Sequence, residues 1–170
     1  MDGRGNRGGV RHVGEDCRRR GQGVDFGVVG EPSSAERLGD IVRVGRRGSL
    51  SGSLTVRGIQ GHVAYPERTS NPIRGLVKLV EALQSQPLDN GNDNFQPSHL
   101  EFVSLDVGNK TGNLIPGEAR AVFNVRFNDI HTAESLAKLL QARAEKAAGG
   151  KIKFSFRFQP SNAGSFVVQP

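Results

Sequence analysis

Apolar residues recur with two different spacings along the chain, and these spacings predict the order of its secondary structure. The clearest strand signal is 152–158, where phenylalanine occupies positions 154, 156 and 158 and polar residues lie between them. The same period of two, typical of a strand with one buried face, marks residues 50–57, 100–107 and 120–127. Apolar residues three and four positions apart predict helices over 72–86 and 132–147.

Local signals fix where the two helices begin and end. Asn71 is a good N-cap and Pro72 suits the first helical position, where its missing donor costs nothing. This helix should end before Pro87. The residues expected to face the core are Ile73, Leu76, Val77, Val80 and Leu83. Thr132 caps the second helix, and Gly149 ends it. Its inward residues are expected to be Leu136, Leu139, Leu140 and Ala144.

The order strand, helix, strand, strand, helix, strand predicts an α+β fold. It describes a split βαβ, or ferredoxin-like, two-layer sandwich: a four-stranded antiparallel sheet with two helices on one face. Both helices need only one sheet face, so the other face and the edges stay open to solvent or to a partner. An exposed edge strand is therefore a predicted dimerisation surface.

Composition narrows the class of protein. A length of 170 residues suits one domain, and the single cysteine, Cys17, excludes an intramolecular disulfide. No apolar run approaches the roughly 18 residues that span a bilayer, and the amino terminus lacks the apolar core of a signal peptide. We expect a cytoplasmic protein with no membrane partner.

The net charge of +6 makes nucleic acid a partner to consider. However, residues 1–22 hold six arginines and six glycines, without apolar periodicity or interleaved aromatics. This segment is expected to be a disordered basic tail, and a shifted reading frame or an internal start would also produce it. A small basic RNA-binding protein is thus the more distant alternative, and nucleic acid is not an expected partner.

Residues 58–66, Gly-Ile-Gln-Gly-His-Val-Ala-Tyr-Pro, place His62 in a glycine-flanked turn just before the capped helix at Asn71-Pro72. Gly30-Glu31-Pro32 and the run 39–49 lie upstream, and Gly-Asn-Leu-Ile-Pro-Gly-Glu at 112–118 lies downstream. This ordered set, from about residue 25 to about residue 158, resembles the bacterial succinyl-diaminopimelate desuccinylases of the zinc aminoacylase and carboxypeptidase family.

The resemblance implies a division of the chain and an activity. Family members are longer, with a catalytic domain split around this segment. The implied parts are a basic tail (1–22), a remnant of the catalytic domain (23–40), a lid and dimerisation domain (41–159), and a tail toward the missing catalytic domain (160–170). The implied reaction is zinc-dependent hydrolysis of N-succinyl-LL-diaminopimelate to succinate and LL-diaminopimelate, in lysine and diaminopimelate biosynthesis. The expected state is a homodimer through the lid, inactive alone; the alternative is an interaction module without catalysis.

The resemblance also implies roles for individual residues. The family holds two zinc ions with five ligands, of which only Glu31 falls within this chain. A single carboxylate cannot hold zinc usefully, so we expect this chain to bind none. His62 matches the lid histidine that donates a hydrogen bond to the oxyanion in the partner subunit's active site. Asn113 matches an asparagine that joins it, although an asparagine in a Gly-Asn turn also suits a structural role in a left-handed conformation.

Four further residues match substrate-binding positions of the family. Arg46 matches the arginine that binds a substrate carboxylate, for which a planar fork with two donors is well fitted. Arg43 stands where relatives often have lysine. Ser49 and Tyr65 match polar residues of the same pocket. A small-molecule substrate is expected only for a complete enzyme.

Overall fold

The computed structural model describes residues 17–21, 36–37, 40–41, 45–159 and 164–168. The chain divides into two compact units at the boundary between residues 42 and 43. In the first unit, residues 17–21 form one helical turn, in which the Gly21 amide donates to the Arg18 carbonyl at 3.1 Å. The predicted zinc ligand Glu31 and the predicted substrate residue Arg43 lie outside the described residues, as does most of the predicted basic tail.

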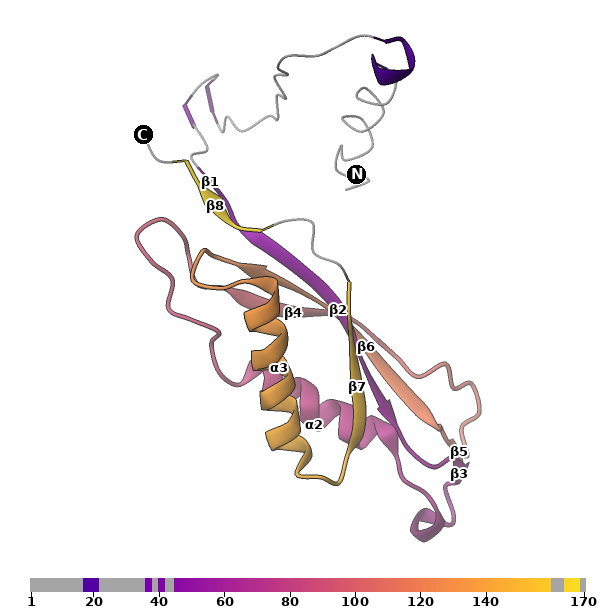
Figure 1. Cartoon of the computed structure of the whole chain (residues 1–170). Coiled ribbons are helices and arrows are strands. Elements are labelled where there is room, and N and C mark those ends of the chain that lie inside the picture. Colours follow the sequence, from indigo (N-terminus) through magenta and orange to yellow (C-terminus); the bar gives the residue numbers. More distant parts are fainter. Residues whose placement is uncertain (1–16, 22–35, 38–39, 42–44, 160–163, 169–170) are drawn as a thin grey trace. The chain divides into compact units, whose positions relative to one another are not determined.

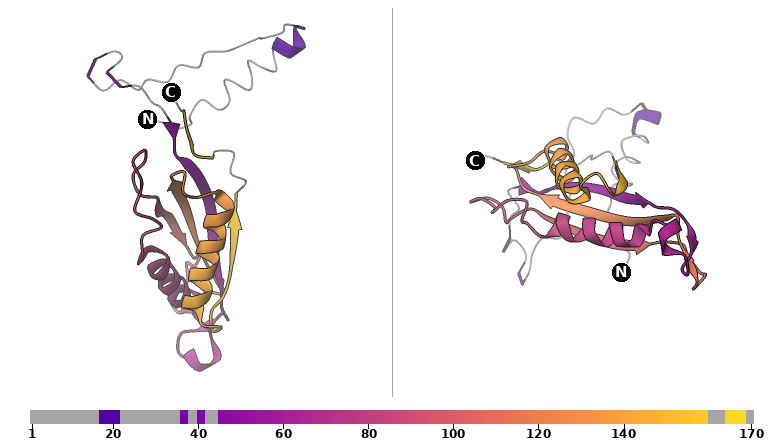
Figure 2. Two further views of the ribbon diagram at one scale, coloured as in Figure 1. Left: turned by 60° about the vertical axis from the view of Figure 1, so that its left-hand side comes forward. Right: turned by 90° about the horizontal axis from the view of Figure 1, so that it is seen from below.

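The second unit is built on a four-stranded antiparallel sheet (Figure 1). Its strand order is β4-β6-β2-β7, with bounds β2 Gly48–Arg57, β4 His99–Asp106, β6 Glu118–Phe127 and β7 Lys153–Phe158. The helices α2 (Pro72–Gln84) and α3 (Ala133–Ala148) share one hydrophobic core with the sheet and lie beside each other (Figure 2). The predicted split βαβ sandwich is confirmed.

Short elements extend both ends of the sheet. The strands β1 (Gly45–Arg46) and β8 (Phe166–Val167) pair at one end, which we call the connection end. At the opposite end, the tip, β3 (Gly61–His62) pairs with β5 (Leu114–Ile115), and the short 3-10 helix η1 (Pro66–Arg68) follows β3 (Figure 1). The strand β2 runs between these two ends.

Aromatic rings fill the middle of the core. Phe123 on β6 is 1% exposed and makes edge-to-face contacts with Phe102, Phe156 and Phe158 at centroid distances of 5.8 to 6.0 Å. Gly52 on β2 leaves room for that ring, since a Cβ there would come within 2.6 Å of it. A glycine inside a strand is thus explained by a neighbouring aromatic ring.

The core-facing side of α2 differs in part from the prediction. Asn71 caps the helix as expected, its Oδ1 accepting from the Ile73 amide at 3.0 Å, and Leu76 and Leu83 are buried. The expectation that Ile73 and Val77 face the core is wrong, because they are 37% and 58% exposed. Leu79, fully buried, takes their place. The helix carries two adjacent apolar lines, and periodicity alone does not decide which one the sheet covers.

The second helix and its caps agree with the prediction. Thr132 and Ser135 form a capping box, and Gly149 ends the helix with φ of 56°, a left-handed conformation that glycine adopts readily. Leu136, Leu140 and Ala144 are buried, and Leu139 packs against the core. Among the helices that the structure describes, none is both long and apolar enough to cross a membrane.

Candidate functional site

The tip brings together two of the predicted site residues, although they are far apart in the sequence. Gly61 pairs with Ile115 and His62 with Leu114 in the β3–β5 ribbon. The Val63 amide extends this ribbon by donating to the Asn113 carbonyl at 3.0 Å. The side chains of His62 and Asn113 therefore meet on one exposed surface.

A backbone hydrogen bond sets the tautomer of His62. The Nδ1 atom accepts from the Ala64 amide at 3.0 Å, so in the neutral ring Nε2 carries the proton. The Nδ2 atom of Asn113 lies 3.5 Å from Nε2. With the ring in this tautomer both atoms are donors, and they can converge on a single acceptor. The pair is thus arranged to receive an oxyanion or a carboxylate oxygen.

Tyr65, predicted as a pocket residue, belongs to the same surface. Its ring centroid is 6.0 Å from that of His62, and its amide donates to the His62 carbonyl at 3.0 Å. The guanidinium of Arg68 lies 5.4 Å from the Tyr65 ring centroid, a cation–π distance. Sequence reasoning missed Arg68; its position three residues after a tyrosine, across one turn of η1, is the signal that could have found it.

The loop before Asn113 is held by its own side chains. Asn109 accepts from the Thr111 amide at 3.1 Å and donates to the Leu114 carbonyl at 2.8 Å. No described residue other than glycine has a positive φ, so Asn113 is not in the left-handed conformation that a structural role would have used. Asn109, which the sequence did not single out, is the residue that shapes this loop.

Arg46 and Ser49 lie at the connection end, away from the tip. The Arg46 guanidinium is 5.6 Å from the ring centroid of Phe166 on β8, and Ser49 accepts a 3.2 Å hydrogen bond from Asn124 on β6. The strand β2, which begins beside Arg46 and includes Ser49, spans about 30 Å over its ten residues before the chain reaches the tip. One copy of the chain therefore does not bring Arg46 and Ser49 together with His62 and Asn113.

The described residues do not form a metal site. Within them, no three side chains of histidine, cysteine, aspartate or glutamate gather closely enough to hold a metal ion. The resemblance implies two zinc ions in the complete protein, with Glu31 as one ligand. Glu31 is not among the residues that the structure describes.

An apolar surface follows the outer edge of the sheet beside α2. The strand β4 is an edge strand of the described sheet, because it pairs with β6 on one side and with no described strand on the other. Val103 at the β4 bulge and Leu105 are 65% and 61% exposed. Leu105 and the exposed helix residues Ile73 and Val77 line a groove of about 570 Å³. Exposed apolar side chains next to an open strand edge favour pairing with another chain.

The open face of the sheet is polar. Asn124 donates to Ser51 at 2.8 Å, and Arg120 donates to Ser53 at 3.4 Å. The phenylalanines of the four-stranded sheet pack on or against the helix-covered core: Phe102, Phe123, Phe127, Phe154, Phe156 and Phe158. A platform for stacking RNA bases needs aromatic rings on the open face.

Relatives in sequence are bacterial enzymes. Over 151 residues the chain is 57% identical to a succinyl-diaminopimelate desuccinylase of Rhodopseudomonas palustris (strain BisB18), a match covering 89% of this chain and 38% of that protein. A succinyl-diaminopimelate desuccinylase of Methylobacterium radiotolerans is 54% identical over 154 residues, covering 91% and 39%. The chain thus spans about two fifths of the length of these curated relatives.

Solved structures share the fold. A hydantoinase/carbamoylase family amidase from Burkholderia ambifaria matches with a TM-score of 0.61 at 10% identity, over 73% of this chain and 30% of that one. A tripeptidase from Staphylococcus aureus matches with a TM-score of 0.58 at 14% identity, over 74% and 32%. The family model described as "Peptidase dimerisation domain" matches residues 44–162. The chain therefore belongs to the peptidase dimerisation domain family.

Proposed function

We propose that this chain is the lid and dimerisation domain of a succinyl-diaminopimelate desuccinylase. The complete protein would hydrolyse N-succinyl-LL-diaminopimelate to succinate and LL-diaminopimelate in lysine and diaminopimelate biosynthesis. The names of two relatives that are 57% and 54% identical support this assignment, and the chain matches 38% and 39% of their lengths, as a part of a longer protein would. The chain by itself is inactive.

The observation that carries the proposal is the donor pair at the tip. His62 offers Nε2–H because its Nδ1 is held by the Ala64 amide, and Asn113 offers a second N–H 3.5 Å away. In amide hydrolysis the carbonyl oxygen becomes an oxyanion. Such donors stabilise this oxyanion more strongly than they stabilise the neutral carbonyl oxygen of the substrate. One donor of this kind contributes about 3 kcal/mol to transition-state stabilisation.

The donor pair serves the active site of a second copy. His62 and Asn113 are exposed at the tip, whereas both the first and the last described residues of the second unit lie at the connection end, about 30 Å away along β2. A donor pair at the end opposite these connections suits an active site in a neighbouring subunit. Arg46 and Ser49, at the connection end, would act in the subunit that contains them.

Two copies pair through the outer edge of β4 and the adjacent face of α2. The exposed residues Val77, Val103 and Leu105 provide the apolar contact, and the open strand edge provides hydrogen-bonding groups. The match to a family of dimerisation domains favours a second copy as the occupant.

Zinc is proposed for the complete enzyme and not for this chain. The described residues do not fit a metal ion, and Glu31 would supply one ligand beside others from the remainder of the protein. The catalytic role proposed for this chain therefore involves only the donors at the tip.

The test is hydrolysis of N-succinyl-LL-diaminopimelate with added zinc. We expect no turnover by the purified chain. We expect activity from a chimaera in which residues 45–159 replace the matching segment of the Rhodopseudomonas palustris enzyme. In that chimaera His62→Ala should lower kcat about 100- to 1,000-fold, because the oxyanion loses a donor. Lys110→Ala, exposed on the neighbouring loop, should leave kcat unchanged.

Either of two results would refute this assignment. Zinc-dependent turnover by the purified chain would mean that it is more than a lid. An active chimaera whose kcat is unaffected by His62→Ala would leave only the alternative, a dimerisation module that takes no part in catalysis.

A further inference from the structure

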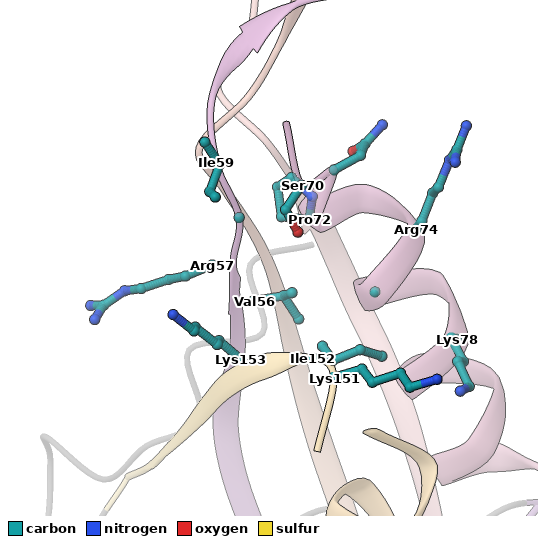
Figure 3. A pocket seen from close by; sticks show the side chains of 13 residues that line it. Val56, Arg57, Ile59, Ser70, Pro72, Arg74, Lys78, Lys151, Ile152 and Lys153 are labelled. Carbon is teal, nitrogen blue, oxygen red and sulfur yellow. The ribbon is translucent and has the colours of Figure 1, made fainter. Parts of the chain in front are cut away.

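A cavity of about 420 Å³ lies beside the start of β7, which is the edge strand at the other end of the strand order from β4. Figure 3 shows the residues that line it. It opens between the end of β2, the first turns of α2 and the start of β7. Five of its thirteen lining residues are basic and none is acidic. The basic residues are Arg57, Arg74, Lys78, Lys151 and Lys153.

The cavity combines an apolar floor with a basic rim. Val56 and Ile152 form the floor, and Gly75 lets α2 approach them closely, since a Cβ there would lie 3.0 Å from a methyl group of each. In Figure 3 the Lys151 side chain extends toward α2, on the side where Lys78 lies. Arg57 and Lys153 extend on the other side of the pocket. The positive charges are therefore distributed on two sides of an apolar surface.

Little negative charge offsets this rim. Arg57 lies 3.4 Å from Glu118 in an exposed ion pair, which contributes little. Among the described residues, no ion pair joins Arg74, Lys78, Lys151 or Lys153 to a carboxylate. Like charges around one concavity repel each other and raise the local potential, and a bound anion would relieve both effects. A surface that needed only solubility would interleave both signs of charge.

We propose that this cavity binds a small organic anion that carries at least two separated anionic groups on an apolar body. Charges on both sides of the floor fit an anionic group at each end of the ligand, and the floor fits its carbon skeleton or ring. The volume is within the range of small-molecule sites. Organic polyphosphates and polycarboxylates share this chemistry. The site is independent of the proposed desuccinylase role, because it uses the β7 edge and none of the residues at the tip or on β4.

The test is a titration of the ¹⁵N-labelled chain, followed by amide NMR shifts, with ADP, citrate and inorganic pyrophosphate at constant ionic strength. We expect saturable shifts confined to residues 56–59, 70–78 and 151–153. Lys78→Gln with Lys151→Gln should weaken binding about tenfold or more, because two exposed rim charges are lost. If ADP binds more tightly than citrate, the ligand class is an organic polyphosphate such as a nucleotide. If citrate binds more tightly, the ligand class is a polycarboxylate.

The matched control is Lys110→Gln with Lys138→Gln, which removes the same charge from exposed positions outside the cavity. Its affinity should stay within about twofold of the parent chain, because charges beyond a Debye length are screened. Equal weakening in both double variants would reduce the effect to net charge and overturn the proposal. Amide shifts that do not saturate with any of the three ligands would also overturn the proposal. So would shifts that are spread over the whole surface of the domain. Unchanged amide dispersion of the free variants shows that they remain folded.

Discussion

Asp89 shows how one buried carboxylate can fix a long loop. Its side chain is 7% exposed, and it accepts from the Gly91 amide at 2.7 Å and from the Asn128 amide group at 2.8 Å. Burial raises the pKa of Asp89, but hydrogen bonds from Ser98, Gly91 and Asn128 together hold it below its ordinary value of 3.8. His131 Nε2 lies 3.2 Å from Oδ2, in a geometry that makes no hydrogen bond. The loop between α2 and β4 is thus tied to the end of β6.

We predict that Asp89→Asn lowers the free energy of unfolding by about 2 kcal/mol at neutral pH. The reason is that hydrogen bonds accepted by a charged carboxylate are replaced by weaker bonds to a neutral amide. A carboxyl whose pKa is lower in the folded state stabilises the fold above its unfolded pKa, near 3.8, and loses that contribution as pH falls through the folded value. Urea unfolding at several pH values should therefore show the gap between parent and variant narrowing below about pH 3.8.

The control for this prediction is Asp93→Asn, an exposed residue of the same loop. It should change the free energy of unfolding by no more than about 0.5 kcal/mol. A gap between the parent chain and Asp89→Asn that stays constant with pH would show that Asp89 acts through packing and not through its charge.

At the scale of elements, local rules predicted more than long-range ones did. The caps at Asn71 and Thr132 and the period of two in β6 depend on residues close in sequence, and all were predicted correctly. The β3–β5 ribbon was not predicted, because each strand has two residues and no periodicity. The exposure of Ile73 and Val77 was not predicted because it depends on how α2 rotates against the sheet.

Gly52 of β2 tests whether aromatic packing sets the sheet. Gly52→Ala should lower the free energy of unfolding by about 2 kcal/mol, because the new Cβ would come within 2.6 Å of the buried Phe123 ring. Gly112→Ala is the control: no atom lies within 4 Å of a Cβ there and its φ is not positive. Urea unfolding should find it no less stable than the parent. Equal effects of the two substitutions would show that chain entropy, and not the ring, explains the glycine.

At the scale of the whole domain, the proposed roles belong to separate surfaces. The tip presents His62 and Asn113, the connection end presents Arg46, the β4 edge carries exposed apolar residues, and the β7 edge carries the basic cavity. A single copy leaves the tip donors without a substrate to act on. The proposed two-fold pairing through β4 would cover the apolar edge and supply the second subunit in which the tip donors are proposed to act.

The pairing predicts that the chain is a dimer in solution and that charge on the β4 surface separates it. Val77→Asp with Leu105→Asp places two carboxylates per copy on exposed apolar positions, so sedimentation equilibrium should give the mass of a monomer. Both side chains are mostly exposed in one copy, so amide dispersion should persist. Ile130→Asp with Val168→Asp, at exposed positions outside this surface, should remain dimeric.

A dimer that survives Val77→Asp with Leu105→Asp would place the interface elsewhere. A parent chain that is monomeric at tens of micromolar would remove the basis for action in trans, because His62 could then complete no second active site.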